Sequence, residues 1–207
     1  MFQWIVVGCL LCTSLPLADE TFSSKLPAPQ SWGGETIRLP PGFAADMSIK
    51  GVEHIRFAPG MMDLQSDSFF CYAFAFELDP KPELTEAVLK EEFLKYYRGL
   101  CKAVLNGKSP EVDPATFTMT LKKSPSKDGA DAGDTTDYVC SICWVEPFAT
   151  KTSQTLNLEL QTWNRDGRNY VFACVSPQAR DAAIWKQLHQ IRDGYLKQQD
   201  LGPRESR

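Results

Sequence analysis

The sequence predicts an α+β fold, in which a mostly antiparallel sheet of about five or six strands is covered by two helices. Three observations predict it. The segment 68–78, SFFCYAFAFEL, is aromatic or apolar on both alternating faces, which indicates a central strand covered on each side. Apolar residues recur three or four positions apart in 84–105 and in 177–192, as in amphipathic helices. Three consecutive strand-like segments lie between residues 137 and 175.

The first eighteen residues, MFQWIVVGCLLCTSLPLA, contain no charged side chain, and their apolar run is far shorter than the roughly 20 residues that span a bilayer. This pattern is typical of a secretory signal peptide. Cleavage after Ala18 or after Ser14 would each leave a small residue at the scissile bond, and both remain open. Cys9 follows a glycine as in a lipoprotein acylation box, but only eight residues precede it, which favours a small apolar role. We therefore expect export, to the periplasm or the cell exterior.

Three regions follow this predicted leader. Residues 19–34 are rich in Ser, Pro and Gly and lack periodicity, which predicts a flexible tether. Residues 35–196 are predicted to form a single α+β domain, and the charged tail 197–207 is predicted to fray. The strand signals lie, in order, at Glu35–Leu39, Val52–Phe57, Ser68–Leu78, Thr116–Lys122, Asp137–Pro147, Thr152–Trp163 and Arg168–Val175. The first two and the fourth of these signals are the weaker ones.

The helix ends carry their own signals. Glu83 and Glu86 lie near the positive N-terminal pole of the first helix, and Asn106-Gly107 is predicted to end it. Ser176-Pro177 is predicted to open the second helix, with Ser as the cap and Pro in the first turn. Gly194 is predicted to stop it.

The turn 164–167 between the last two strands allows two registers that differ by one residue. A two-residue Asp-Gly turn would pair Trp163 with Tyr170. A type I turn followed by a glycine bulge would pair Asn164 with Arg168, and would align the apolar residues of the last strand with the three leucines of the strand before it. Only the second register makes one coherent apolar face, so the sequence favours it.

Five cysteines follow the leader: Cys71, Cys101, Cys140, Cys143 and Cys174. Cys140 and Cys143 form a Cys-x-x-Cys pair whose flanks indicate strand, where residues three apart point to opposite faces. The pair is therefore interpreted as structural rather than as a redox or metal centre. Disulfides are the alternative in an exported protein, with Cys71–Cys101 the favoured bridge, and the odd count leaves a thiol unpaired.

Other reactive groups are sparse. His54 and His189 are the two histidines, and each is expected to be an ordinary structural or surface residue. Asp128, Asp131, Asp134 and Asp137 recur every three residues, but their spacing fits no EF-hand, so a solvated loop is preferred over calcium. No metal and no cofactor are predicted. Trp144, Trp163, Tyr170 and Phe172 are interpreted as core aromatics rather than the lining of an apolar groove.

The formal charge of −4 is spread without a basic stripe, which argues against nucleic acids and anionic membrane surfaces as partners. No segment after the leader is long and apolar enough to be a transmembrane helix. Aromatic packing without convergent reactive groups favours a non-enzymatic binding or interaction module, with an unknown small molecule or protein as its partner. One alternative is a hydrolase that uses carboxylates, for which Glu77, Glu146 and Glu159 would have to share a cleft. Another is a structural component of a surface assembly, attached by its N-terminal tether.

Overall fold

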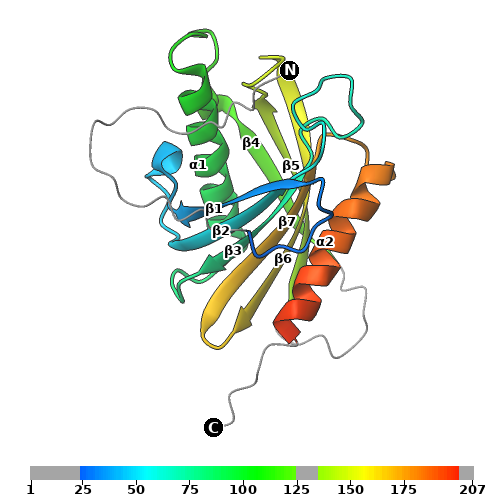
Figure 1. Cartoon of the computed structure of the whole chain (residues 1–207). Helices are drawn as coiled ribbons and strands as arrows, with labels where there is room; N and C mark the ends of the chain where they lie inside the picture. The colour runs from blue at the N-terminus through cyan, green and yellow to red at the C-terminus, as the bar shows by residue number, and fades with distance from the viewer. Residues whose placement is uncertain (1–23, 125–134, 201–207) are drawn as a thin grey trace, which may run out of the picture.

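The computed structural model describes residues 24–124 and 135–200, which form one seven-stranded antiparallel sheet with a helix on each face (Figure 1). The strands are β1 (Gly33–Leu39), β2 (Gly51–Phe57), β3 (Tyr72–Leu78), β4 (Thr118–Lys123), β5 (Thr136–Val145), β6 (Ser153–Arg165) and β7 (Arg168–Ser176), and the helices are α1 (Glu86–Leu105) and α2 (Ala183–Asp200). The predicted α+β class is confirmed, with more strands than the five or six expected. The predicted leader lies outside the described residues.

Two meanders make up the sheet, whose strand order is β1-β2-β3-β7-β6-β5-β4. The first meander is β1-β2-β3 and the second is β4 to β7, each built from antiparallel neighbours. They join where β3 pairs with β7, with Tyr72 opposite Val175 and Glu77 opposite Tyr170. Between the meanders the chain runs through α1, so this helix lies across one face of the sheet (Figure 1). No helix in the described ranges has an apolar stretch long enough to cross a membrane.

Helix α1 begins and ends where its local chemistry dictates. Thr85 is the N-cap, and its side chain accepts a hydrogen bond from the backbone N–H of Val88. Asn106 ends the helix in the left-handed conformation, with φ of 45°, and its N–H donates to the carbonyl of Lys102. The predicted helix at 84–105 is thereby confirmed, with its first turn starting at Glu86.

The larger core lies between α1 and the sheet. Alternate residues of each strand point into it, as the period of two requires. It contains Tyr72, Phe74 and Phe76 of β3, Leu156, Leu158 and Leu160 of β6, and Leu89, Phe93, Tyr97 and Cys101 of α1. All of these side chains are buried. The strand predicted to be covered on both faces is therefore central in the sheet, as expected.

A second core lies on the opposite face, under α2. It contains Phe172 and Cys174 of β7 together with Trp185, Leu188 and Tyr195 of α2. Leu26 and Trp32 also lie in it, with 1% and 4% of their surface exposed. Residues 24–32, here called the N-terminal strap, are thus packed against the domain. The prediction of a flexible tether is wrong for this part of 19–34.

Helix α2 differs from its prediction at both ends. It begins at Ala183, several residues after the predicted start. The hydroxyl of Ser176 accepts a hydrogen bond from the N–H of Gln178, and this contact caps a turn rather than the helix. It runs through Gly194 to Asp200, so the first residues of the predicted frayed tail 197–207 are helical. Gly194 has a different role: a Cβ there would lie 3.0 Å from Pro27 of the strap, so glycine allows the strap to approach the helix.

The register favoured for the last hairpin is also wrong. Trp163 pairs with Tyr170, and the turn is the two-residue Asp166-Gly167. These two residues have φ of 51° and 73°, as a type I′ turn requires. Because helices cover both faces of the sheet, the apolar residues of β7 need not share a face with the leucines of β6. Phe172 instead packs beneath α2.

The cysteine pair behaves as the strand interpretation predicts. In β5, Cys140 is buried on the α1 side and Cys143 is exposed on the other side. The alternative of a Cys71–Cys101 bridge is wrong, because Cys71 lies in the core under α2 and Cys101 in the core under α1. These five thiols are all free.

Candidate functional site

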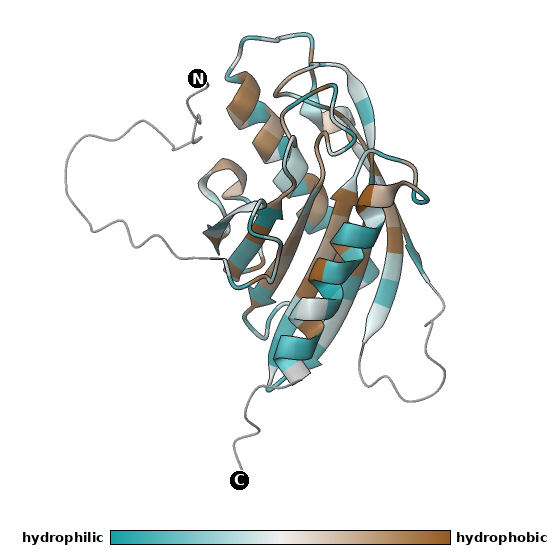
Figure 2. Cartoon of the chain, turned by 45° about the vertical axis from the view of Figure 1, so that its right-hand side comes forward, coloured by the Kyte–Doolittle hydropathy of each residue, from teal (hydrophilic) through white to brown (hydrophobic). Residues whose placement is uncertain are grey.

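The sheet is covered unequally on the α2 side. Helix α2 packs on β7 and β3, and within residues 24–124 and 135–200 no helix covers the same face of β5 and β4 (Figure 2). We call this uncovered surface the open sheet face; it consists of Thr118, Thr120, Lys122, Val139, Ser141, Cys143 and Thr155. All of these residues are exposed except the half-buried Ser141. These seven residues include four hydroxyl groups and one cation, and Asp137 lies on the same face of β5.

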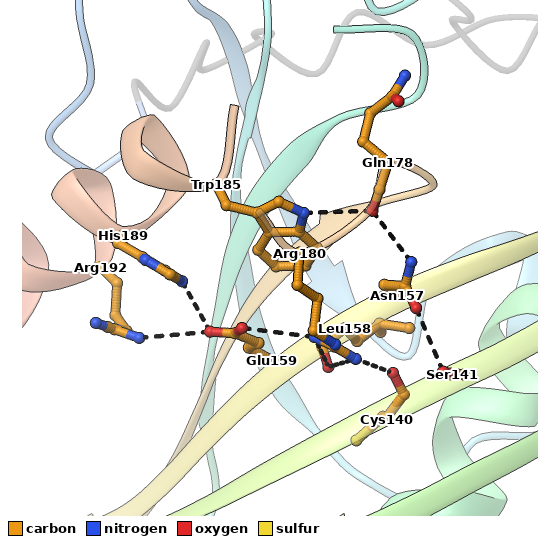
Figure 3. A network of polar contacts seen from close by, with 10 residues as sticks. All are labelled: Cys140, Ser141, Asn157, Leu158, Glu159, Gln178, Arg180, Trp185, His189 and Arg192. Carbon is orange, nitrogen blue, oxygen red and sulfur yellow. Dashed lines mark hydrogen bonds and ion pairs between the residues drawn. The ribbon is translucent and has the colours of Figure 1, made fainter. Parts of the chain in front are cut away.

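A polar network borders the open sheet face where α2 meets β6 (Figure 3). Its centre is Glu159 of β6, whose Oε2 lies 2.8 Å from His189 Nε2 and 3.9 Å from Arg192 Nη1. Its Oε1 lies 3.5 Å from Arg180 Nη1. The hydrogen bond from His189, helped by the charges of the two arginines, lowers the pKa of Glu159 against the opposing effect of burial. The network therefore keeps this carboxylate ionised.

Arg180 links the network to two strands. Its Nη2 donates to the carbonyl of Cys140 in β5 at 2.9 Å, and its Nη1 reaches the carbonyl of Leu158 in β6 at 3.4 Å (Figure 3). Its guanidinium carbon lies 5.4 Å from the ring centroid of Trp185, as in a cation–π contact. The carbonyl of Gln178 accepts from the indole N–H of Trp185 at 3.3 Å. These contacts fix the chain before α2 onto the edge of the open sheet face.

Glu77 lies in a different environment, at the strap. Its Oε2 accepts from Lys25 at 3.2 Å, and its Oε1 accepts from the hydroxyl of Tyr195 at 3.1 Å. His54 Nε2 lies 3.7 Å from the same Oε1. The structure thus pairs each histidine with one of the suggested carboxylates, His54 with Glu77 and His189 with Glu159, in two separate clusters.

Glu146 belongs to neither cluster. It follows β5 and is fully buried, and its two oxygens accept from the backbone N–H groups of Phe148, Ala149 and Thr150 at 2.6 to 3.1 Å. It therefore closes the loop between β5 and β6. The three carboxylates suggested for a hydrolase are each bound by different groups, and no two of them share a partner.

Two buried carboxyl groups were missed from the sequence. Glu53 of β2 is fully buried, with the Tyr96 hydroxyl 3.1 Å from its Oε1, and burial raises its pKa to about 8. Glu92 of α1 accepts from the N–H of Ser48 at 2.7 Å and of Ile49 at 3.2 Å. A signal for Glu53 existed: it shares a strand face with Ile55, two residues away, which is an apolar core residue.

The aromatic residues weighed as a groove are core material, as interpreted. Trp144 and Phe172 are buried in opposite cores, and Trp163 stacks on Tyr170 with ring centroids 5.2 Å apart. Among residues 24–124 and 135–200, no three His, Cys, Asp or Glu side chains are grouped as a metal site would need. Of the four aspartates considered for calcium, only Asp137 falls inside these ranges. No protein-family model, curated protein or solved structure matched the chain.

Proposed function

We propose that the protein is an exported, non-enzymatic binding or interaction module whose contact surface is the open sheet face. The observation that carries the proposal is that α2 leaves this face uncovered while the polar network fixes its border. A flat strand surface held rigid by its own border loses little entropy on binding. Its hydroxyl groups suit a partner that offers hydrogen-bonding groups of its own.

The polar network supports binding over hydrolysis. Glu159 lies against His189 and two arginines, and its lowered pKa makes it a poor general acid near neutral pH. The hydrolase alternative has one observation in its favour, since a carboxylate that orients an imidazole is a common catalytic pair. Among the described residues, however, no hydroxyl or thiol hydrogen-bonds to His189 as a nucleophile would.

Export is part of this proposal, and it depends on the uncharged leader 1–18. The intact mass of protein purified from its own source tests it. Loss of the first 14 or 18 residues is expected. A mass that retains them would remove the argument for an oxidising compartment.

Cys143 offers a direct test of the contact surface, because it is the exposed thiol at the centre of the open sheet face. A benzophenone maleimide attached to it should form crosslinks to a partner when the protein is returned to its native compartment. The matched control carries Cys143→Ser together with Lys90→Cys, which moves the label to the exposed side of α1. Crosslinks from residue 143 and none from residue 90 are expected. Equal yields from the two positions would contradict the proposal.

A further inference from the structure

The groove that holds the N-terminal strap has a floor of small residues. Ala73 and Ala75 of β3 and Cys71 just before it are all fully buried, and Ala58 beside them is 4% exposed. Small side chains leave space between a sheet and the helix above it, and protein interiors do not leave such space empty. Leu26 and Trp32 of the strap lie in the same cluster as these residues. The two strap side chains therefore act as anchors in a groove between α2 and the strands β3 and β7.

Side-chain contacts hold the strap, rather than strand pairing. Arg56 of β2 donates from Nε to the carbonyl of Leu26 at 2.9 Å and from Nη2 to that of Ser24 at 3.1 Å. Lys25 is bonded to Glu77. In the described ranges the strap forms no backbone hydrogen bond to the sheet. Because these contacts come from side chains and not from strand pairing, the same segment of another chain could make all of them.

A buried histidine lies close to the strap. His54 precedes Arg56 by two residues on the same face of β2 and is 3% exposed. Its Nδ1 lies 3.1 Å from the Thr36 hydroxyl, and its Nε2 has no hydrogen-bond partner in the part of the chain that the structure describes. The charged and titratable groups that face it are Glu77 of β3, Lys25 of the strap and, through Glu77, Tyr195 of α2.

Acid should therefore weaken the seated strap. Burial is the main cause that lowers the pKa of His54 below its ordinary value of 6.5, and Lys25 adds to this effect while Glu77 opposes it. Because release of the strap removes the Lys25 charge, the imidazole binds a proton more readily in the released state, so the seated state loses stability as the pH falls below that ordinary value.

We propose that this groove is a docking site with an exchangeable occupant, and that the strap of a second copy of the chain binds it in place of the chain's own strap. The strap is the segment whose fit to the groove is seen directly. Gly33 and Gly34 are the first residues of β1 and pair with Phe57 and Arg56 of β2, so both anchors lie on the same side of the point where strand pairing begins and can move together. In such an exchange each copy would place its strap in the groove of the other, which gives a symmetric dimer with no groove left for a third copy. This inference concerns a different surface from the open sheet face and stands independently of the proposed function.

The probe is a fluorescein-labelled peptide of residues 24–32, SKLPAPQSW, added to the full chain. In fluorescence anisotropy it should bind the Leu26→Ala protein roughly tenfold more tightly than the wild type, because the weakened strap vacates the groove more often. Because acid weakens the seated strap and the bound peptide alike, the peptide should bind the wild type faster, and not more tightly, at about pH 5.5 than at about pH 7.5. The matched control peptide carries alanine in place of Leu26 and Trp32 and should not bind.

Exchange is measured with two isotopically distinct preparations of the wild-type chain, mixed at high concentration and followed by native mass spectrometry. Mixed dimers should accumulate faster at the lower pH, and excess peptide should dissolve them. A dimer that persists in excess peptide, or a chain that stays monomeric, would overturn the proposal. So would failure of the peptide to bind both wild type and Leu26→Ala. If Leu26→Ala does not fold, binding of the peptide to the wild type at the lower pH is the test, and a lack of binding there would overturn the proposal.

Discussion

The buried carboxyl group of Glu53 makes the stability of the protein depend on pH in an unusual direction. Its side chain is fully buried between α1 and the sheet, and its hydrogen-bond partner is the neutral hydroxyl of Tyr96. Burial is the largest cause that raises its pKa, from 4.5 to about 8. Between these two values the folded chain holds a proton that the unfolded chain has released. The folded state therefore loses stability as the pH rises through this interval.

The size of the effect follows from the interval. Each pH unit in which the two states differ by one proton changes the free energy of unfolding by about 1.4 kcal/mol. Over the range from 4.5 to about 8 this amounts to roughly 5 kcal/mol, which is comparable with the whole stability of many domains. Glu53→Gln removes the ionisation and keeps an acceptor for Tyr96. The variant should match the wild type near pH 5 and exceed it by several kcal/mol near pH 9.

Urea unfolding followed by tryptophan fluorescence measures this difference at each pH, and contributions of other groups cancel between wild type and variant. Glu92→Gln is the matched control. Burial would raise the pKa of Glu92, but hydrogen bonds from Lys95, Ser48 and Ile49 together lower it. Its stabilising contribution is present above 4.5 and is lost as the pH falls, so the control should have the opposite slope. A pH-independent difference for Glu53→Gln would refute a protonated buried carboxyl.

Three further substitutions test other parts of the structure. In urea unfolding, Glu159→Gln should reduce the free energy of unfolding by about 1–3 kcal/mol near neutral pH and by less in acid. The reason is that the pKa of Glu159 is lowered in the folded state, so the stabilisation that its carboxylate provides is lost as the pH falls. Equal losses at both pH values would contradict this. Glu146→Gln should reduce the free energy of unfolding by roughly 2–4 kcal/mol. Both carboxylate oxygens now accept hydrogen bonds from backbone N–H groups, and the amide NH2 of glutamine would face one of these donors. An unchanged free energy of unfolding would show that the loop closes by other contacts. In Gly194→Val, the valine side chain would displace Pro27 of the strap, so Trp32 should become more accessible to acrylamide quenching. Unchanged quenching would contradict the packing of the strap against α2.

The sequence predicted those parts of the fold that local patterns determine. Alternation over residues 137–147 was enough to place Cys140 and Cys143 on opposite faces, and the cap signals located the end of α1 at Asn106. The strap could not be predicted, because a segment rich in Ser and Pro resembles a linker and only the fold provides a groove for Leu26 and Trp32. Likewise, the hairpin register depends on whether the second face of the sheet is covered, and the hairpin itself carries no signal for that.

The polar groups were harder to predict than the fold. Glu159 and His189 were each noticed, but they are 30 positions apart and only the packing of α2 on β6 brings them together. Glu53 and Tyr96 are 43 positions apart and neither stands out alone. The open sheet face did have a signal in the threonines of β4, since polar residues at every second position are typical of a strand with one solvated face.

Reactivity of Cys143 before and after the protein reaches its native compartment tests the central claim most directly. The four other thiols after the leader are buried, and burial raises the pKa of each. In purified protein, a maleimide should therefore modify residue 143 alone and rapidly. In the native compartment the same thiol should react much more slowly, while a cysteine introduced at Lys90 in the Cys143→Ser protein reacts at one rate in both settings. Equal reactivity of Cys143 in the two settings would mean that no partner covers the open sheet face.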